Sequence, residues 1–65
     1  MGKRFRINDT QEISLDELNQ RYNHPDDAQF RDEAKVMEVG QIIYIPTGFD
    51  WAGAPTHDDK VECIE

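Results

Sequence analysis

Cysteine and long apolar runs are almost absent from this 65-residue chain. Its one cysteine, Cys63, cannot form a disulfide within the chain, and a single thiol is typical of a reducing compartment. The longest strictly apolar run is Ile42–Ile45, far short of the ~20 residues that cross a bilayer. No apolar segment follows the basic residues near the start, so no signal peptide is expected. We therefore expect a cytoplasmic protein that does not enter a membrane.

Basic side chains are also scarce. The chain has 7 Lys and Arg against 14 Asp and Glu, which gives a formal net charge of −7. Lys3, Arg4 and Arg6 precede residue 7, which leaves −10 on residues 7–65. Nucleic acids and anionic membranes are bound by clustered cations, so neither is an expected direct partner. The balance favours a partner protein with a basic surface, although excess charge can also serve only to keep a small protein in solution.

The length allows one small domain, residues 1–65. A chain of this size buries only about 60% of the surface of its unfolded state, so its core is small. Dinucleotide-binding units and barrel enzymes need several times this length. Self-association would bury more surface, and we expect a homodimer or a tight complex with another chain.

The clearest local signal is a helix start at Ser14. Ser14 suits an N-cap, and Glu17, three residues later, completes a capping box. Ile13 and Leu18 match the apolar staple that often brackets such a cap. The pattern predicts a helix over Leu15–Tyr22.

A second helix is predicted after a break at Asn23 and His24. Proline disfavours helical geometry in the residue before it and suits the first turn of a new helix. We therefore expect a helix from Pro25 to about Lys35, or to Met37 in its longer form. One bent helix is the alternative.

Three strands complete the predicted fold. Residues 3–7 alternate polar and apolar, and residues 8–12 have the composition of a loop. Gln41–Pro46 is apolar at nearly every position, which predicts a central strand covered on both faces or a strand covered by a partner. Residues 47–59 are expected to be a connection, and Lys60–Glu65 a closing strand. The predicted fold class is α+β, a small single domain with about three β-strands and two short helices.

Residues 44–50, Tyr-Ile-Pro-Thr-Gly-Phe-Asp, resemble a stretch of the small T7-type phage inhibitors of bacterial RNA polymerase. The aromatic, Pro, Gly and Phe positions agree. The resemblance implies a compact α+β protein that docks on a larger enzyme and inhibits it. A phage-encoded chain of this kind would act in the host cytoplasm.

Residues 40–51 resemble the second sequence motif of the cupin superfamily. Gly40, Pro46 and Gly48 stand at the spacing of that motif, whereas Trp51 occupies the position of its metal-binding His. The resemblance implies, as an alternative function, a reduced cupin-type metal-binding module or enzyme. Trp51 cannot bind the metal.

Two short segments combine His with carboxylates. His24 precedes Asp26 and Asp27, and His57 precedes Asp58 and Asp59. Such groups can hold a metal, but Asp is equally typical of turns and helix starts, and neither spacing matches a known ligand signature.

No nucleophile has a base beside it in the sequence. A buried small hydrophobe is the expected role of Cys63, because no neighbouring base lowers its pKa. We therefore expect no catalytic residue, no cofactor and no bound metal.

The expected partner-binding residues are two aromatic residues and five carboxylates. These are Phe49, Asp50, Trp51, Asp58, Asp59, Asp26 and Asp27. The aromatic pair can pack over the small core or anchor a partner, and the carboxylates in turns are expected to be exposed.

The sequence therefore predicts a small acidic protein-binding module. It would be an inhibitor or adaptor that docks on a basic surface of a larger nucleic-acid-handling protein, such as a polymerase or nuclease. Its carboxylates could mimic nucleic-acid phosphates, or it could make an ordinary protein–protein contact. A small structural subunit of a larger assembly is a further alternative.

Overall fold

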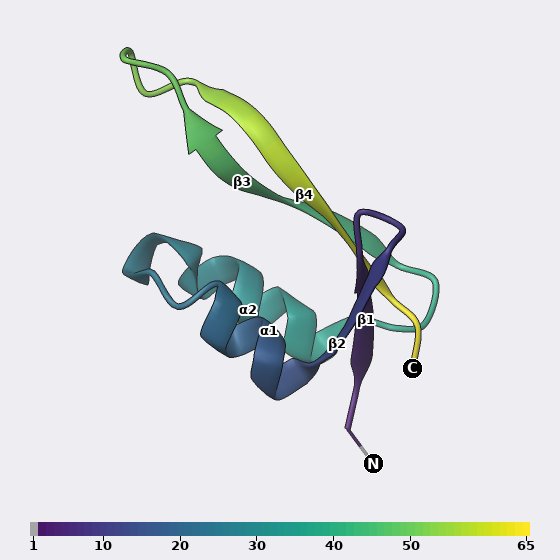
Figure 1. The fold of residues 1–65 in the computed structure, drawn as a ribbon. Helices are drawn as coiled ribbons and strands as arrows, with labels where there is room; N and C mark the ends of the chain where they lie inside the picture. Colours follow the sequence, from purple (N-terminus) through teal and green to yellow (C-terminus); the bar gives the residue numbers. More distant parts are fainter. Residues whose placement is uncertain (1) are drawn as a thin grey trace.

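A computed structural model describes residues 2–65 as one sheet with helices on one side (Figure 1). The strands form a four-stranded antiparallel sheet in the order β2-β1-β4-β3. The elements are β1 (Arg4–Ile7), β2 (Gln11–Ser14), α1 (Leu15–Arg21), the 3-10 helix η1 (Pro25–Asp27), α2 (Ala28–Val36), β3 (Ile42–Phe49) and β4 (Pro55–Cys63). The α+β class is confirmed, but the expected three strands are four.

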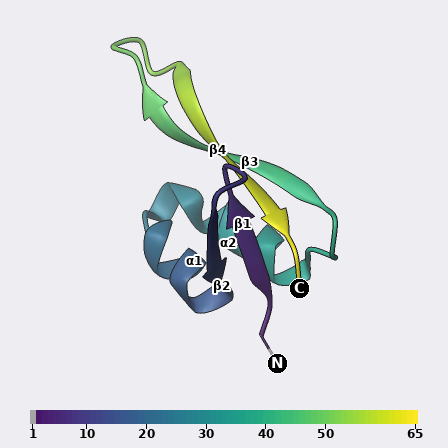
Figure 2. The ribbon, with the colours of Figure 1, turned by 45° about the vertical axis from the view of Figure 1, so that its right-hand side comes forward.

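The core lies between the helices and one face of the sheet (Figure 2). Alternate side chains of the strands face α1 and α2, as the two-residue period of a strand requires. The buried apolar residues are Phe5, Ile7, Ile13, Leu18, Tyr22, Ala34, Met37, Ile45, Val61 and Cys63. Cys63 is only 1% exposed, so its predicted burial as a small hydrophobe is confirmed.

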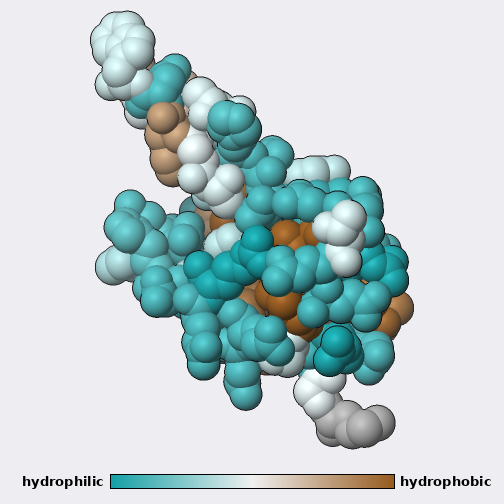
Figure 3. All heavy atoms as spheres, viewed as in Figure 1, coloured by the Kyte–Doolittle hydropathy of each residue, from teal (hydrophilic) through white to brown (hydrophobic). Residues whose placement is uncertain are grey.

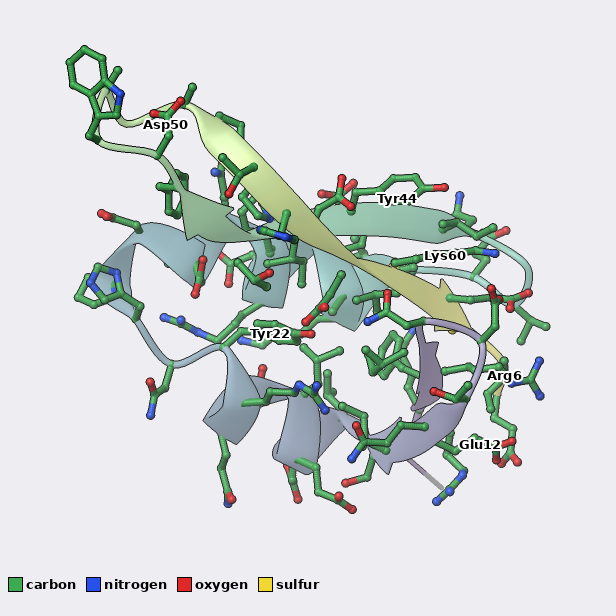
Figure 4. All side chains as sticks on the ribbon, turned by 45° about the horizontal axis from the view of Figure 1, so that its top comes forward. Arg6, Glu12, Tyr22, Tyr44, Asp50 and Lys60 are labelled. Atoms are coloured by element: carbon green, nitrogen blue, oxygen red, sulfur yellow. The ribbon has the colours of Figure 1, made fainter. Side chains whose placement is uncertain are left out.

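The opposite face of the sheet is open and carries charge pairs between strands. Arg6 lies 3.3 Å from a Glu12 carboxylate oxygen and 3.9 Å from one of Glu62. Figure 4 shows Arg6 and Glu12 at this end of the sheet. The pairs are partly exposed, so each adds little stability, but they neutralise most cations of the first strand. With the helices on one face and this open face on the other, the protein has two layers, one of helices and one of sheet.

The strand β2 is not predicted by the sequence pattern, which gives residues 8–12 the composition of a loop. Asn8 and Asp9 adopt positive φ angles of 52° and 65°. Two such residues make a tight hairpin turn whose twist matches the flanking strands. The chain therefore turns over residues 8–10, where the Thr10 amide donates to the Ile7 carbonyl over 3.1 Å, and pairing resumes with Ile7 opposite Gln11.

The helix start at Ser14 is confirmed. Its hydroxyl accepts a hydrogen bond from the Glu17 amide over 3.2 Å. The second half of the capping box differs, because the Glu17 carboxylate lies 3.4 Å from the Ser14 hydroxyl itself. The helix ends at Arg21, one residue before the predicted end.

The break before Pro25 is also confirmed, which overturns the alternative of one bent helix. Pro25 opens the 3-10 turn η1 rather than the α-helix itself. The helix α2 then runs from Ala28 to Val36. No helix within residues 2–65 is long and apolar enough to cross a membrane.

Two expectations for the second half of the chain are wrong. The strand β3 lies at an edge of the sheet and pairs with β4 alone, so it is not a central strand. Most of the expected connection at residues 47–59 is also strand, because β3 runs to Phe49 and β4 begins at Pro55. The closing strand thus starts before Lys60 and ends at Cys63.

Candidate functional site

The far half of the β3–β4 hairpin, residues 46–58, projects from the body of the protein and is called the arm below (Figures 1 and 2). Only Val61–Cys63 of β4 also pair with β1, so within the arm each strand has one neighbour. The protein is consequently elongated, with extents of 41 × 23 × 16 Å. A long two-stranded projection buries little, so most residues of the arm are exposed and none belongs to the core.

The arm ends in a turn that Asp50 holds together. Its carboxylate accepts hydrogen bonds from the amides of Ala52 and Ala54, each over 2.9 Å. The Asp50 amide in turn donates to the Ala54 carbonyl over 2.9 Å. Gly53 has a φ of 83°, a conformation that glycine adopts without strain. Figure 4 shows Asp50 at this tip, where its carboxylate fixes the turn.

Trp51 stands on this turn with 99% of its surface exposed, and Phe49 below it is 62% exposed. Of the two roles open to these aromatic residues, packing over the core is therefore excluded. Tryptophan is highly buried on average, so a fully exposed ring on a hydrogen-bonded turn is unusual. Figure 3 shows an apolar patch on the arm among hydrophilic side chains.

A cleft of about 410 Å³ separates the underside of the arm from η1 and the end of α1. Its walls combine three carboxylates, one guanidinium, one imidazole and the rings of a tyrosine and a phenylalanine. The lining residues are Arg21, Tyr22, His24, Asp26, Asp27, Pro46, Thr47, Phe49 and Asp59. Carboxylates from η1 and β4 thus meet the aromatic side of the arm in one hollow.

The inner wall of the cleft is a fixed hydrogen-bond network. The Tyr22 hydroxyl donates to Asp59 over 2.7 Å, and Asn8 donates to the other carboxylate oxygen over 2.9 Å. Burial raises the pKa of Tyr22, and the Asp59 carboxylate raises it further. The Arg21 guanidinium lies 5.8 Å from the centre of the Tyr22 ring. Asp59 is therefore a structural carboxylate, half-buried on β4, and not the exposed turn residue expected from sequence.

The outer wall of the cleft is the short helix η1. The His24 ring nitrogen Nδ1 accepts from the Asp26 amide over 3.1 Å and caps the helix. Arg31 donates to the carbonyls of Tyr22 and His24, over 2.6 and 2.8 Å, and so fixes the loop before η1. The Asp26 carboxylate is 90% exposed, as expected, whereas Asp27 is half-buried.

The structure brings four of the seven expected partner-binding residues to one place. Phe49, Asp26, Asp27 and Asp59 line the cleft. Asp50 and Trp51 lie at the tip of the arm. Asp58 is exposed on β4 and does not line the cleft. The expected site is thus two neighbouring surfaces, a tip and a cleft, with Asp58 apart from both.

Five cleft residues are not among the partner-binding residues expected from the sequence, namely Arg21, Tyr22, His24, Pro46 and Thr47. The core stripe of the first helix accounts for the Tyr22 ring but not for its hydroxyl. A buried tyrosine hydroxyl needs a partner, and that requirement points to a polar group elsewhere in the chain. No sequence signal indicates that Asp59 supplies it.

The two His–Asp segments do not come together in space to form a larger group. Across residues 2–65 no three His, Cys, Asp or Glu side chains stand close enough to hold a metal ion. His57 instead packs over Gly48, where an added Cβ would meet its Nδ1 at 2.9 Å. A side chain at position 48 would therefore require the exposed His57 ring to shift.

Comparisons with known proteins return nothing similar to this chain. No protein-family model, no curated protein and no solved structure matches it.

Proposed function

We propose that this chain is an acidic protein-binding module, an inhibitor or adaptor that docks its arm on a basic surface of a larger nucleic-acid-handling protein. The observation that carries the proposal is Trp51, 99% exposed on a turn that Asp50 fixes. A rigid aromatic anchor loses little conformational entropy on binding, so its burial by a partner contributes fully to affinity. The fold itself gains nothing from this side chain.

The charge around the arm supports a basic partner. Asp50 and Asp58 are the ionised residues of the arm, and residues 46–58 contain no Lys or Arg. Asp26, which lines the cleft, adds a third exposed carboxylate to these two residues of the arm. Surfaces that bind nucleic acid are rich in Lys and Arg, and a field of opposite sign speeds encounter with them.

The cleft is suited to an arginine side chain of the partner. Its stem would lie against the Phe49 ring, and its guanidinium would reach the carboxylates of Asp26 and Asp27, which outnumber the one cation of the cleft, Arg21. Tip and cleft would then contact one basic surface together. Two mechanisms of inhibition follow: the carboxylates replace phosphates, or the contact blocks movement of the partner.

Capture from lysate with matched baits tests the proposal. The parent protein, Trp51→Ala and the control Val39→Ala are immobilised, and captured proteins are quantified by mass spectrometry. Val39 is 69% exposed but lies outside arm and cleft, so its loss controls for general stickiness. We expect a basic nucleic-acid-binding protein on the parent and on Val39→Ala, and its loss from Trp51→Ala. Equal capture by all three baits, or capture of acidic proteins only, would exclude the proposed function.

Phosphate mimicry is then tested on the purified partner. Under mimicry, the parent protein competes with the partner's nucleic acid, and its affinity falls steeply with salt. An ordinary contact leaves nucleic-acid binding intact, and its affinity falls less with salt than under mimicry.

A further inference from the structure

The edge of the sheet at β3 is open along its length. The strand β4 pairs with one side of β3, and no described strand pairs with the other. Proteins commonly protect such edges with charged side chains. Residues 39–49 contain no charge at all, although 32% of the chain is Asp, Glu, Lys or Arg. The opposite edge of the sheet, β2, is only four residues long and carries Glu12.

The free hydrogen-bonding groups of this edge belong to Ile42 and Tyr44. On β4, Lys60 exchanges bonds with Asn8 on the β1 side, whereas Cys63 bonds Gly40 and Gln41 on the β3 side. Directions alternate along an antiparallel strand. Ile42 and Tyr44, which lie before the register shift that follows Pro46, therefore direct their amide and carbonyl groups away from β4.

Apolar side chains flank these free groups on both faces of the strand. Ile42 and Tyr44 are 43% and 56% exposed on the face of the sheet opposite the helices. On the helix side, a groove of about 400 Å³ runs between the edge and the end of α2. Val36, which is 74% exposed, and Ile43 line it together with Glu33 and Gln41. The edge thus offers backbone bonds and apolar contacts together.

We propose that this edge binds the β3 edge of a second copy of the chain, antiparallel and about a two-fold axis at Ile43. This register places Ile42 opposite Tyr44 of the second copy, and Tyr44 opposite Ile42 of the second copy. Each of these pairs exchanges both of its backbone hydrogen bonds. It also places a β-branched side chain against an aromatic ring, a favourable cross-strand pair.

The edge fits a second copy because it is complementary to itself. The run at residues 39–49 carries no charge, so pairing of this run in two chains of net charge −7 brings no like charges directly opposite each other along the strands. Pro46 has no amide to donate, so the added pairing stops there. A two-fold contact occupies the β3 edge of each copy, so no β3 edge remains free for a third copy. The result is a dimer with one continuous sheet across both copies rather than a filament.

Two complementary variants test the register. Ile42→Lys faces Glu62 within its own chain, and Tyr44→Glu faces Lys60, so both preserve the fold. Each variant alone places a charge against an apolar side chain of the second copy, and its dimer should weaken about tenfold. Mixed in equal amounts, the two variants bring the introduced lysine of one copy opposite the introduced glutamate of the other, and they should regain a dimer. Sedimentation of each variant and of the mixture gives the three affinities.

Hydrogen exchange and sedimentation of the parent complete the test. In the dimer the amides of Ile42 and Tyr44 should become protected as the protein concentration rises. A monomer of 7.6 kDa at all micromolar concentrations, or exchange at these amides that ignores concentration, overturns the proposal. A dimer that both variants leave unchanged places the interface elsewhere and also overturns it.

Absence of the β3 dimer can be distinguished from absence of docking on a basic partner. Salt screens repulsion between two acidic copies, so it should strengthen the dimer while it weakens docking on a basic partner. Trp51→Ala should lose the partner and keep the dimer, whereas Ile42→Lys should do the reverse. A Trp51→Ala variant that is monomeric would contradict the β3 interface.

Discussion

The Tyr22 hydroxyl at the end of α1 donates a 2.7 Å hydrogen bond to Asp59 on β4. The same carboxylate accepts from Asn8 in the β1–β2 turn over 2.9 Å. One side chain thus joins the first hairpin, the first helix and the base of the arm. The junction therefore ties the base of the arm to the body of the protein.

Tyr22→Phe should destabilise the protein while leaving its shape intact. The ring is only 5% exposed and remains packed, but Asp59 loses a donor. A hydrogen bond to a charged group contributes about 1.5–3 kcal/mol. Thermal unfolding should move down by about 4–8 °C for each kcal/mol lost in a domain of this size. An unchanged melting temperature would show that the bond contributes nothing to stability.

Alkaline pH should weaken the parent through the same residue. Burial, and then the Asp59 carboxylate, raise the pKa of Tyr22 above the ordinary value of 10.0. A raised folded-state pKa gives stability that is complete below pH 10 and declines as pH rises through the folded value. Denaturant unfolding should therefore show a falling free energy above pH 10.

Tyr22→Phe is the control for this pH dependence, since Lys60 titrates in the same range. The hydrogen bond with Asp9 raises the pKa of Lys60. Its contribution is likewise lost at high pH and persists in the variant. Between neutral pH and about pH 11, the free energy of unfolding of the parent should fall by more than that of Tyr22→Phe. If the two free energies fall by the same amount, titration of Tyr22 does not contribute to the pH dependence.

Adjacent carboxylates on β4 should respond differently to charge reversal. Asp58 is exposed, so Asp58→Lys should keep the circular dichroism spectrum and slow association with a basic partner. Asp59→Lys removes the acceptor of both Tyr22 and Asn8 and should destabilise the fold. The association defect of Asp58→Lys should shrink at high salt, where steering is already screened. Equal melting temperatures for the two variants would contradict the structural role of Asp59.

Local signals in the sequence predict local structure well. Ser14 and Glu17 are sufficient for the first helix start, because a cap is made by residues three apart. Pro25 is sufficient for the break between helices for the same reason. The burial of Cys63 follows from alternation with Val61, which reflects a sheet face covered by helices.

The arm and β2 escape prediction because their pairing depends on residues far along the chain. Alternation marks a strand only where one face is buried, and neither face of the arm is covered by a helix. In β2, Ile13 is the one apolar residue, and pairing with β1 determines the strand. The tip shows the same limit, since exposure of Trp51 follows from the length of the hairpin and not from its neighbours in sequence.

Loss of the helix cap gives a simple test of the first helix. Ser14→Ala removes the acceptor of the Glu17 amide, and such a loss costs about 1 kcal/mol. The melting temperature should fall by about 4–8 °C. Ser14→Asp retains an acceptor at the cap and should restore most of the difference. If Ser14→Ala melts like the parent, the cap does not stabilise α1.

Trp51 offers the sharpest separation of folding from binding. With the ring 99% exposed, Trp51→Ala removes no packing and should unfold at the temperature of the parent. It should also bind the partner at a similar association rate but dissociate faster, because a buried anchor acts mainly on the lifetime of a complex. With the parent or the variant immobilised on a sensor surface and the partner in solution, the association and dissociation rates are both measured directly.

Intrinsic fluorescence provides an independent reading of the same residue, since the chain contains one tryptophan. In the free protein Trp51 should emit as a water-exposed indole and be quenched freely by acrylamide. Binding of the partner should shift the emission to shorter wavelength and reduce quenching, because the ring leaves water. Dimerisation through β3 should change neither, since the tip of the arm lies beyond Pro46, where the added pairing stops. Protection of Trp51 by self-association alone would mean that the tip, and not the β3 edge, joins the two copies.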